Sequence, residues 1–250
     1  MRTTILIPTY NNAKTVCDVI RRSDQVCPDV MVVNDGSTDD TLVRLQTLQK
    51  ELPFELVSYE DNRGKGGALK AGFRRAKALG FTHVLTLDAD GQHFPEDAPL
   101  LLEAGERDPE AIIVGSRSFG DENMPGGNVF ANKFSNFWFT VQTLQRIPDT
   151  QTGFRLYPLD HIGGLRVLTA RYEAELELLV FSAWRGTKLI PVPIRVYYPP
   201  IEERVSHFRP TMDFVRITIL NTILCLLAIV YGGPRMLFNY LKKRLIGNNQ

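Results

Sequence analysis

The chain has 250 residues, of which 44% are hydrophobic, so it can bury a substantial core and a generally disordered protein is excluded. Its 29 basic and 28 acidic residues leave a formal charge of +1, which gives no argument for a nucleic-acid partner. Cys17, Cys27 and Cys225 form no Cys-x-x-Cys pair, and the odd number of thiols argues against a disulfide framework and for a reducing compartment.

Short apolar runs alternate with helical patterns in the first half of the chain, which is typical of βαβ units around a mostly parallel sheet. Strands are predicted over residues 3–7, 30–34, 54–58, 82–87, 111–116 and 188–196. Helices are predicted over residues 13–22, 38–50, 67–79, 128–146 and 171–184, with Ser37 or Thr38 as the start signal of the second. The predicted fold class is therefore α/β, and the turn-rich residues 120–127 are expected to form a mobile loop over a ligand.

The end of the chain is apolar and basic. Residues 217–231 span about 22 Å as a helix, which is less than the roughly 30 Å hydrocarbon core, so a clean membrane crossing is not favoured. Residues 234–245 place a Lys-Lys-Arg run beside apolar side chains, which is typical of an interfacial helix; a core helix with a solvated basic tail is the alternative. The amino terminus lacks the apolar stretch of a signal peptide. We therefore expect a cytoplasmic domain at 1–210, and helices at 211–250 that make the protein peripheral or monotopic on the inner face of the cell membrane.

The segment Asp88-Ala89-Asp90-Gly91 directly follows the strand predicted at 82–87. Two carboxylates one residue apart at the carboxyl end of a strand, where open α/β sheets keep their ligands, are suited to holding a divalent cation against a phosphate. Asp and Gly are also common turn residues, so an acidic turn is the alternative.

Two further polar segments follow predicted strands. Tyr10 offers an aromatic face beyond the first strand, and Asp35 beyond the second can accept a hydrogen bond from a base or a ribose. Helix-capping turns would explain Asn12 and Ser37 without any ligand, and both interpretations stay open. Arg63 and Lys65 lie in a glycine-rich segment that opens a helix, where a phosphate would be well received. No Walker A loop or Gly-x-Gly-x-x-Gly fingerprint is present, so an ATPase or dinucleotide fold is disfavoured.

The order of these motifs resembles glycosyltransferase family 2, and within it the dolichyl-phosphate mannose synthase-like branch. The motifs are Ile7-Pro8-Thr9-Tyr10-Asn11, Val33-Asn34-Asp35-Gly36-Ser37, Asn62-Arg63-Gly64-Lys65-Gly66, Asp88-Ala89-Asp90-Gly91-Gln92-His93, Gly115-Ser116-Arg117 and Gln151-Thr152-Gly153-Phe154-Arg155. The resemblance covers roughly residues 3–210 and implies a GT-A type, Rossmann-like sheet.

The resemblance also implies roles for the matching residues. The nucleotide sugar would be bound by Pro8, Tyr10, Asn12, Asp35, Arg63, Lys65 and Ala89. Asp88 and Asp90, with Gln92 nearby, would hold Mg²⁺ or Mn²⁺ on the diphosphate, while Arg117 and Arg155 would meet the charge of the departing phosphate. The family often has Glu where this chain has Asn12.

The sequence indicates the acceptor-binding residues less clearly than the nucleotide-binding residues. The branch usually shows an Arg-x-x-Gly-x-Ser-Lys pattern, whereas this chain has a shorter one in which Arg204, Ser206, His207 and Arg209 are the tentative acceptor-binding residues. A polyprenyl phosphate can attack without help, but a hydroxyl needs a general base. Asp149 is a candidate for that base, although it could equally orient Arg155 or cap a turn. The acidic residues at 173, 175 and 177 are expected to form a partly solvated helix face without a catalytic role.

The resemblance therefore implies a metal-dependent, inverting glycosyltransferase that moves a hexose from a UDP- or GDP-sugar to a lipid-linked acceptor, with polyprenyl phosphate favoured. A hydroxyl of a glycolipid or saccharide is the alternative acceptor. A non-catalytic module that binds nucleotide sugars and recruits a partner to the membrane is the alternative of another class.

Overall fold

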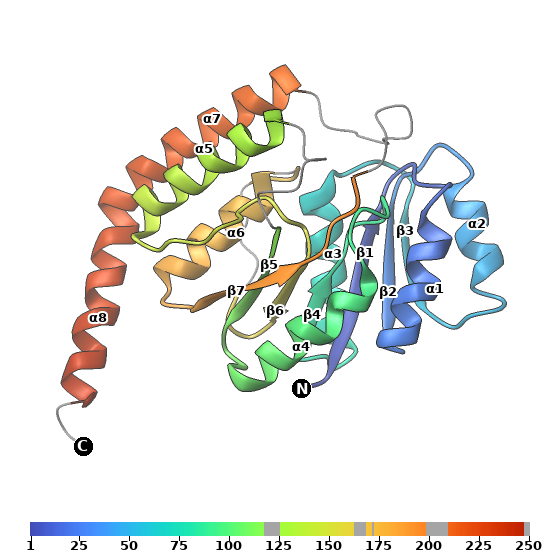
Figure 1. Cartoon of the computed structure of the whole chain (residues 1–250), viewed down its shortest axis with the longest axis horizontal. Helices are drawn as coiled ribbons and strands as arrows, with labels where there is room; N and C mark the ends of the chain where they lie inside the picture. The colour runs from blue at the N-terminus through green and yellow to red at the C-terminus, as the bar shows by residue number, and fades with distance from the viewer. Residues whose placement is uncertain (118–125, 163–168, 172, 199–209, 248–250) are drawn as a thin grey trace.

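The computed structural model of the chain describes residues 1–117, 126–162, 169–171, 173–198 and 210–247. Its centre is a seven-stranded sheet in the order β3-β2-β1-β4-β6-β5-β7 (Figure 1). The strands are β1 (Thr3–Thr9), β2 (Val30–Asp35), β3 (Glu55–Tyr59), β4 (His83–Thr86), β5 (Ile112–Arg117), β6 (Arg155–Pro158) and β7 (Leu189–Ile194). Only β6 runs antiparallel to its neighbours, so the prediction of a mostly parallel α/β sheet is confirmed.

Helices cover both faces of the sheet, and the alternation of side chains along β1 shows why. Ile5 and Ile7 belong to the core that includes residues of α1 (Val16–Val26), α2 (Thr41–Leu48) and α4 (Ala98–Arg107). Leu6, between them, belongs to the opposite core with residues of α3 (Lys65–Ala78), α5 (Gly126–Thr143) and α6 (Glu173–Trp184). A strand buried on both faces reads as a continuous apolar run, as this one does.

Three local features differ from the sequence prediction. Strand β6 was not predicted because it has only four residues, beginning at the last residue of the Gln-Thr-Gly-Phe-Arg motif, and is too short to show alternation. Helix α4 follows a 3₁₀ turn, Pro95–Asp97, and was also missed. Helix α2 begins at Thr41 rather than near Thr38, because the Oδ1 atom of Asp39 accepts the N–H of Thr41 at 2.9 Å.

The carboxyl-terminal helices form one long apolar rod. Helix α7 (Pro210–Leu227) continues through a π-helical turn (Ala228–Gly232) into α8 (Gly233–Gly247), which extends away from the sheet (Figure 1). The π turn accommodates the proline at position 234, which cannot donate a backbone hydrogen bond. The residues between Val215 and Lys242 form the one helix in the described part of the chain that is long and apolar enough to cross a membrane. The expectation that the apolar segment is too short is therefore wrong; the boundary at residue 210 stays a prediction.

Candidate active site

The polar segments predicted to bind a ligand meet at one edge of the sheet. Strands β1 and β2 are parallel and in register, with Thr9 opposite Asn34, so the loops that follow them emerge together. The loop after β4, which carries Asp88 and Asp90, lies beside them because β4 pairs with β1 on its other side. Thr15 ties the first and third loops together, since its hydroxyl donates to the carbonyl of Ala89 at 2.6 Å. Such an edge is where open α/β sheets bind ligands.

Asp88 lies against a buried cation. The Nζ atom of Lys65, the first residue of α3, is 2.7 Å from Oδ1 of Asp88 and 2.9 Å from Oε2 of Glu175. Burial opposes ionisation of Asp88, but the Lys65 ammonium outweighs it and holds the pKa of that carboxyl below its usual range. Asp88 therefore carries its negative charge at neutral pH.

The pKa of Asp90 is shifted in the opposite direction to that of Asp88. Burial, together with the negative charge of Asp88, raises the pKa of Asp90 to about 6. Its Oδ1 atom accepts the backbone N–H of Gln92 at 3.0 Å, which fixes the turn. A divalent cation between the two carboxylates would relieve their repulsion, and oxygen atoms are the ligands that Mg²⁺ and Mn²⁺ prefer. The residues therefore fit a metal ion.

The protein supplies few ligands for such an ion. In the described ranges, no group of three or more His, Cys, Asp or Glu side chains is arranged to hold a metal. Two carboxylates would leave most coordination positions of the ion for diphosphate oxygens and water, as is usual for Mg²⁺ in phosphate-transfer sites. The assignment of Gln92 as a third ligand stays a prediction.

Arg117, at the end of β5, is held by Asp149. The Nε and Nη2 atoms of Arg117 donate to the two carboxylate oxygens at 2.6 and 3.0 Å, and its backbone N–H donates to the same group. Asp149 also accepts the backbone N–H groups of Gln151 and Thr152. Of the roles considered for Asp149, the structure thus shows the turn cap, and it shows orientation of Arg117 rather than of Arg155.

Arg155 is fully buried at the start of β6. Its Nη1 atom donates to the hydroxyl of Tyr157 and to the carbonyl of Glu175, and its Nη2 atom donates to the carbonyl of Thr150. This environment differs from the phosphate contact that the motif predicted. The guanidinium instead fastens β6 to α6, and any action on a phosphate would have to pass through the residues around it.

Asp35, one of the predicted nucleotide-binding residues, is also a buried acid. Asp35 is 2% exposed, and its Oδ1 atom accepts the backbone N–H of Arg63 at 2.9 Å; burial raises the pKa of this carboxyl. The Arg63 guanidinium lies 3.8 Å from the centre of the Tyr59 ring. Pro8 is buried in β1. The Nδ2 atom of Asn12 donates to the hydroxyl of Thr9 and to the carbonyl of Tyr10, so its side chain fixes the turn before α1 and does not cap the helix.

The three glutamates of α6 are buried, so the prediction of a partly solvated acidic face is wrong. Glu173, Glu175 and Glu177 are 8%, 6% and 0% exposed, and Glu177 accepts two hydrogen bonds from Thr169. The sequence carries a signal of this burial. Apolar residues occur on all sides of the helix between the glutamates, which is typical of a helix that is buried all round. Sequence reasoning thus missed Glu175 as a partner of Lys65.

Two sets of predicted residues lie outside the described part of the chain. They are residues 120–125 of the predicted loop, and the predicted acceptor residues Arg204, Ser206, His207 and Arg209.

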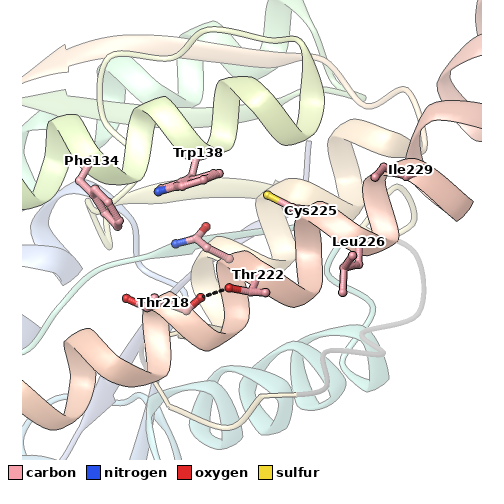
Figure 2. A pocket seen from close by; sticks show the side chains of 8 residues that line it. Phe134, Trp138, Thr218, Thr222, Cys225, Leu226 and Ile229 are labelled. Atoms are coloured by element: carbon pink, nitrogen blue, oxygen red, sulfur yellow. Dashed lines mark hydrogen bonds between the residues drawn. The ribbon is translucent and has the colours of Figure 1, made fainter.

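An apolar groove of about 240 Å³ lies between α5 and α7, as Figure 2 shows. Phe134 and Trp138 line one side, and Cys225, Leu226 and Ile229 are among the residues on the other.

The fold is that of open α/β proteins, which bind their ligands at the carboxyl ends of parallel strands, and here that edge is acidic. Residues 4–161 match glycosyl transferase family 2, and the chain belongs to this family. It is therefore a glycosyltransferase, not a non-catalytic binding module.

Two of the similar proteins are named as enzymes that transfer mannose to a polyprenyl phosphate. The chain is 30% identical to the polyprenol monophosphomannose synthase of Mycolicibacterium smegmatis, over 77% of this chain and 76% of that one. It is 29% identical to the undecaprenyl-phosphate mannosyltransferase of Micrococcus luteus, over 78% and 83% of the two chains. Its fold is similar to that of glucosyl-3-phosphoglycerate synthase from Mycobacterium tuberculosis, solved with Mn²⁺ and UDP, with a TM-score of 0.64 at 18% identity over 90% of this chain and 78% of that one.

Proposed function

We propose that the enzyme transfers a hexose from a UDP- or GDP-sugar to a polyprenyl phosphate, with inversion at the anomeric carbon. An acceptor phosphate oxygen would form a bond to the anomeric carbon as the bond from that carbon to the diphosphate oxygen breaks, and the electron pair would leave with the diphosphate. A metal ion on Asp88 and Asp90 would supply charge stabilisation to that leaving group. Arg117, fixed in orientation by Asp149, would supply a second positive charge nearby.

The observation that carries the choice of acceptor is the environment of Asp149. This carboxylate accepts five hydrogen bonds, three of them from Arg117, and is fully buried. Its oxygens are occupied by donors, which favours a positioning role over removal of a substrate proton. A phosphate acceptor is already anionic and needs no base, whereas a hydroxyl acceptor does.

The carboxyl-terminal rod supports a lipid-linked acceptor. Val230 is 73% exposed and Ile229 74% exposed, although each is a large apolar residue. Exposed apolar surface of this kind marks a membrane or partner contact. We propose that the rod associates with the inner face of the cell membrane, where nucleotide sugars are available.

The test is a donor and acceptor screen with the full-length enzyme and Mn²⁺ or Mg²⁺. UDP- and GDP-hexoses are offered with a polyprenyl phosphate, with the matching polyprenol and with a glycolipid, and products are identified by mass spectrometry. Transfer to the phosphate alone is the expected result. Transfer to the polyprenol or the glycolipid, with none to the phosphate, would overturn the proposed acceptor and favour the hydroxyl alternative.

A further inference from the structure

A buried ammonium group stands between acids from two distant parts of the chain. Lys65 begins α3, Asp88 follows β4 and Glu175 lies in the first turn of α6. The Lys65 Nζ atom is 2.7 Å from Asp88 and 2.9 Å from Glu175, and the three side chains are 15%, 24% and 8% exposed. Ion pairs this short and this sheltered are weakly screened by solvent.

Packing holds the three groups together. Helices α3 and α6 touch at Gly66, where an added Cβ would lie 2.4 Å from the Cβ of Ala174. Gly153 covers the pair from another side, since its Cβ would lie 2.4 Å from Oδ2 of Asp88 and 2.8 Å from Nζ of Lys65. The ammonium is therefore enclosed, and its position is set by the fold.

Hydrogen bonding alone does not explain why Glu175 is buried beside Lys65. Its Oε2 atom contacts Lys65, but its Oε1 atom is buried without a hydrogen-bond partner among the described residues. Such an arrangement costs stability, and its remaining effect is the negative charge that it places beside Lys65. Together, the three carboxylates of Asp88, Asp90 and Glu175 and the one ammonium carry a formal charge of −2.

We propose that Lys65 is the built-in counter-cation of the Asp88–Asp90 pair, and that Glu175 sets the divalent-cation affinity of this pair by balancing the charge of Lys65. With both residues present, Lys65 offsets part of the negative charge of the pair, and Glu175 offsets Lys65, so that the cluster attracts a divalent cation. Without Glu175, Lys65 would be held by Asp88 alone and would repel the cation. This inference rests on the proposed metal-dependent function.

The experiment measures Mn²⁺ binding directly, with no nucleotide present. Full-length protein in detergent at pH 8 is titrated with Mn²⁺, and the free ion is followed by electron paramagnetic resonance. Lys65→Met, with a formal charge of −3, is expected to bind Mn²⁺ about tenfold more tightly. Glu175→Gln, with a formal charge of −1, is expected to bind about tenfold more weakly, and the double variant is expected to return close to the wild-type affinity.

The exposed pair of Arg75 and Glu55, 2.7 Å apart on the surface, provides matched controls. Arg75→Met and Glu55→Gln are expected to leave Mn²⁺ binding unchanged. A purely structural role for Lys65 and Glu175 would weaken binding in both single variants, and that result, or no change in either, would overturn the proposal. If Glu175→Gln does not fold, tighter binding by Lys65→Met still tests the sign. If the wild type binds no Mn²⁺, both the proposed metal-dependent function and this inference fail. If the wild type binds Mn²⁺ but the variants do not change its affinity as expected, only this inference fails.

Discussion

At the scale of single residues, the acids of this sheet edge are stabilised in different ways. Asp88 is paired with Lys65, Asp149 with Arg117, and Asp35 with backbone N–H groups of the glycine-rich loop. At Asp90, by contrast, burial, and after it the negative charge of Asp88, raises the pKa of the carboxyl to about 6. This contrast makes Asp90 the position where a cation would bring the greatest electrostatic gain.

Asp90→Asn is expected to lower transferase activity by about 100-fold or more, because the amide is a weaker ligand for the metal on the leaving group. The free energy of unfolding should not fall, since the substitution removes a buried charge that is repelled by Asp88. Initial rates at several Mn²⁺ concentrations, with thermal unfolding alongside, check both expectations. Asp18→Asn, at an exposed surface carboxylate, is the control. Wild-type turnover by Asp90→Asn would contradict the metal assignment.

Asp149→Asn is expected to lower the unfolding free energy by about 3–5 kcal/mol, because it leaves the guanidinium of Arg117 buried without its counter-charge. Activity should fall with it, while the pH dependence of the residual activity should keep its wild-type form. Denaturant unfolding and a pH–rate profile measure the two effects. Disappearance of the acidic limb of the profile would instead indicate that Asp149 acts as a general base.

His83 is expected to make the fold less stable in mild acid. Burial lowers the pKa of this imidazole below its ordinary value of 6.5, and its Nε2 atom lies 2.8 Å from the carbonyl of Pro109. The folded state therefore binds a proton less readily than the unfolded state, so stability is full above pH 6.5 and declines as the pH falls from there toward the folded-state pKa. His83→Gln should reduce this decline in urea unfolding measured from pH 7.5 to 5; an unaltered decline would count against the assignment.

At the scale of helices and strands, regular patterns were predictable and short or interrupted elements were not. Six of the seven strands follow from apolar runs, but β6 is too short to show alternation and depends on β4 and β5 on either side of it. The interruption of the apolar rod at Gly232 and Gly233 predicted two helices, yet packing against Trp184 continues the helix through a π turn.

Gly232→Ala is expected to destabilise the protein by about 1–3 kcal/mol, because its Cβ would lie 2.4 Å from Cε2 of the Trp184 ring, which is fully buried. Gly233→Ala is the matched control on the same rod, since its Cβ would meet only the carbonyl oxygen of Ala228, at 3.1 Å. Thermal unfolding of the two variants measures the difference. Equal effects would show that the contact between the π turn and Trp184 is not tightly packed.

At the scale of the whole molecule, the rod is partly core and partly surface. Leu220 and Leu224 are 5% and 1% exposed and join the core with Trp184, while much of the rest of the rod faces away from the sheet. Removal of all residues after 210 would therefore uncover apolar core surface. Substitution of the outer face is the cleaner test of membrane association.

The triple substitution Ile229→Ser, Leu237→Ser and Phe238→Ser is expected to lower partitioning into lipid vesicles at least tenfold. Each of these exposed apolar side chains contributes about 1 kcal/mol or more when it leaves water. Vesicle sedimentation of the full-length protein measures the change. Val43→Ser, at an equally exposed apolar residue on α2, should have no effect. Unchanged partitioning of the triple variant would exclude this face as the membrane contact.

Local sequence patterns were enough to predict most of the sheet and the edge at which the polar segments meet. Alternating or continuous apolar runs depend on near neighbours in the chain, and polar segments after parallel strands must meet at one edge. The pairing of charged side chains, in contrast, follows from the packing of distant elements. Lys65 meets Glu175, and Arg117 meets Asp149, because helices and strands far apart in the chain pack together, and no local pattern encodes such contacts. The same holds for the glutamates of α6, whose burial depends on what covers the helix rather than on their own polarity.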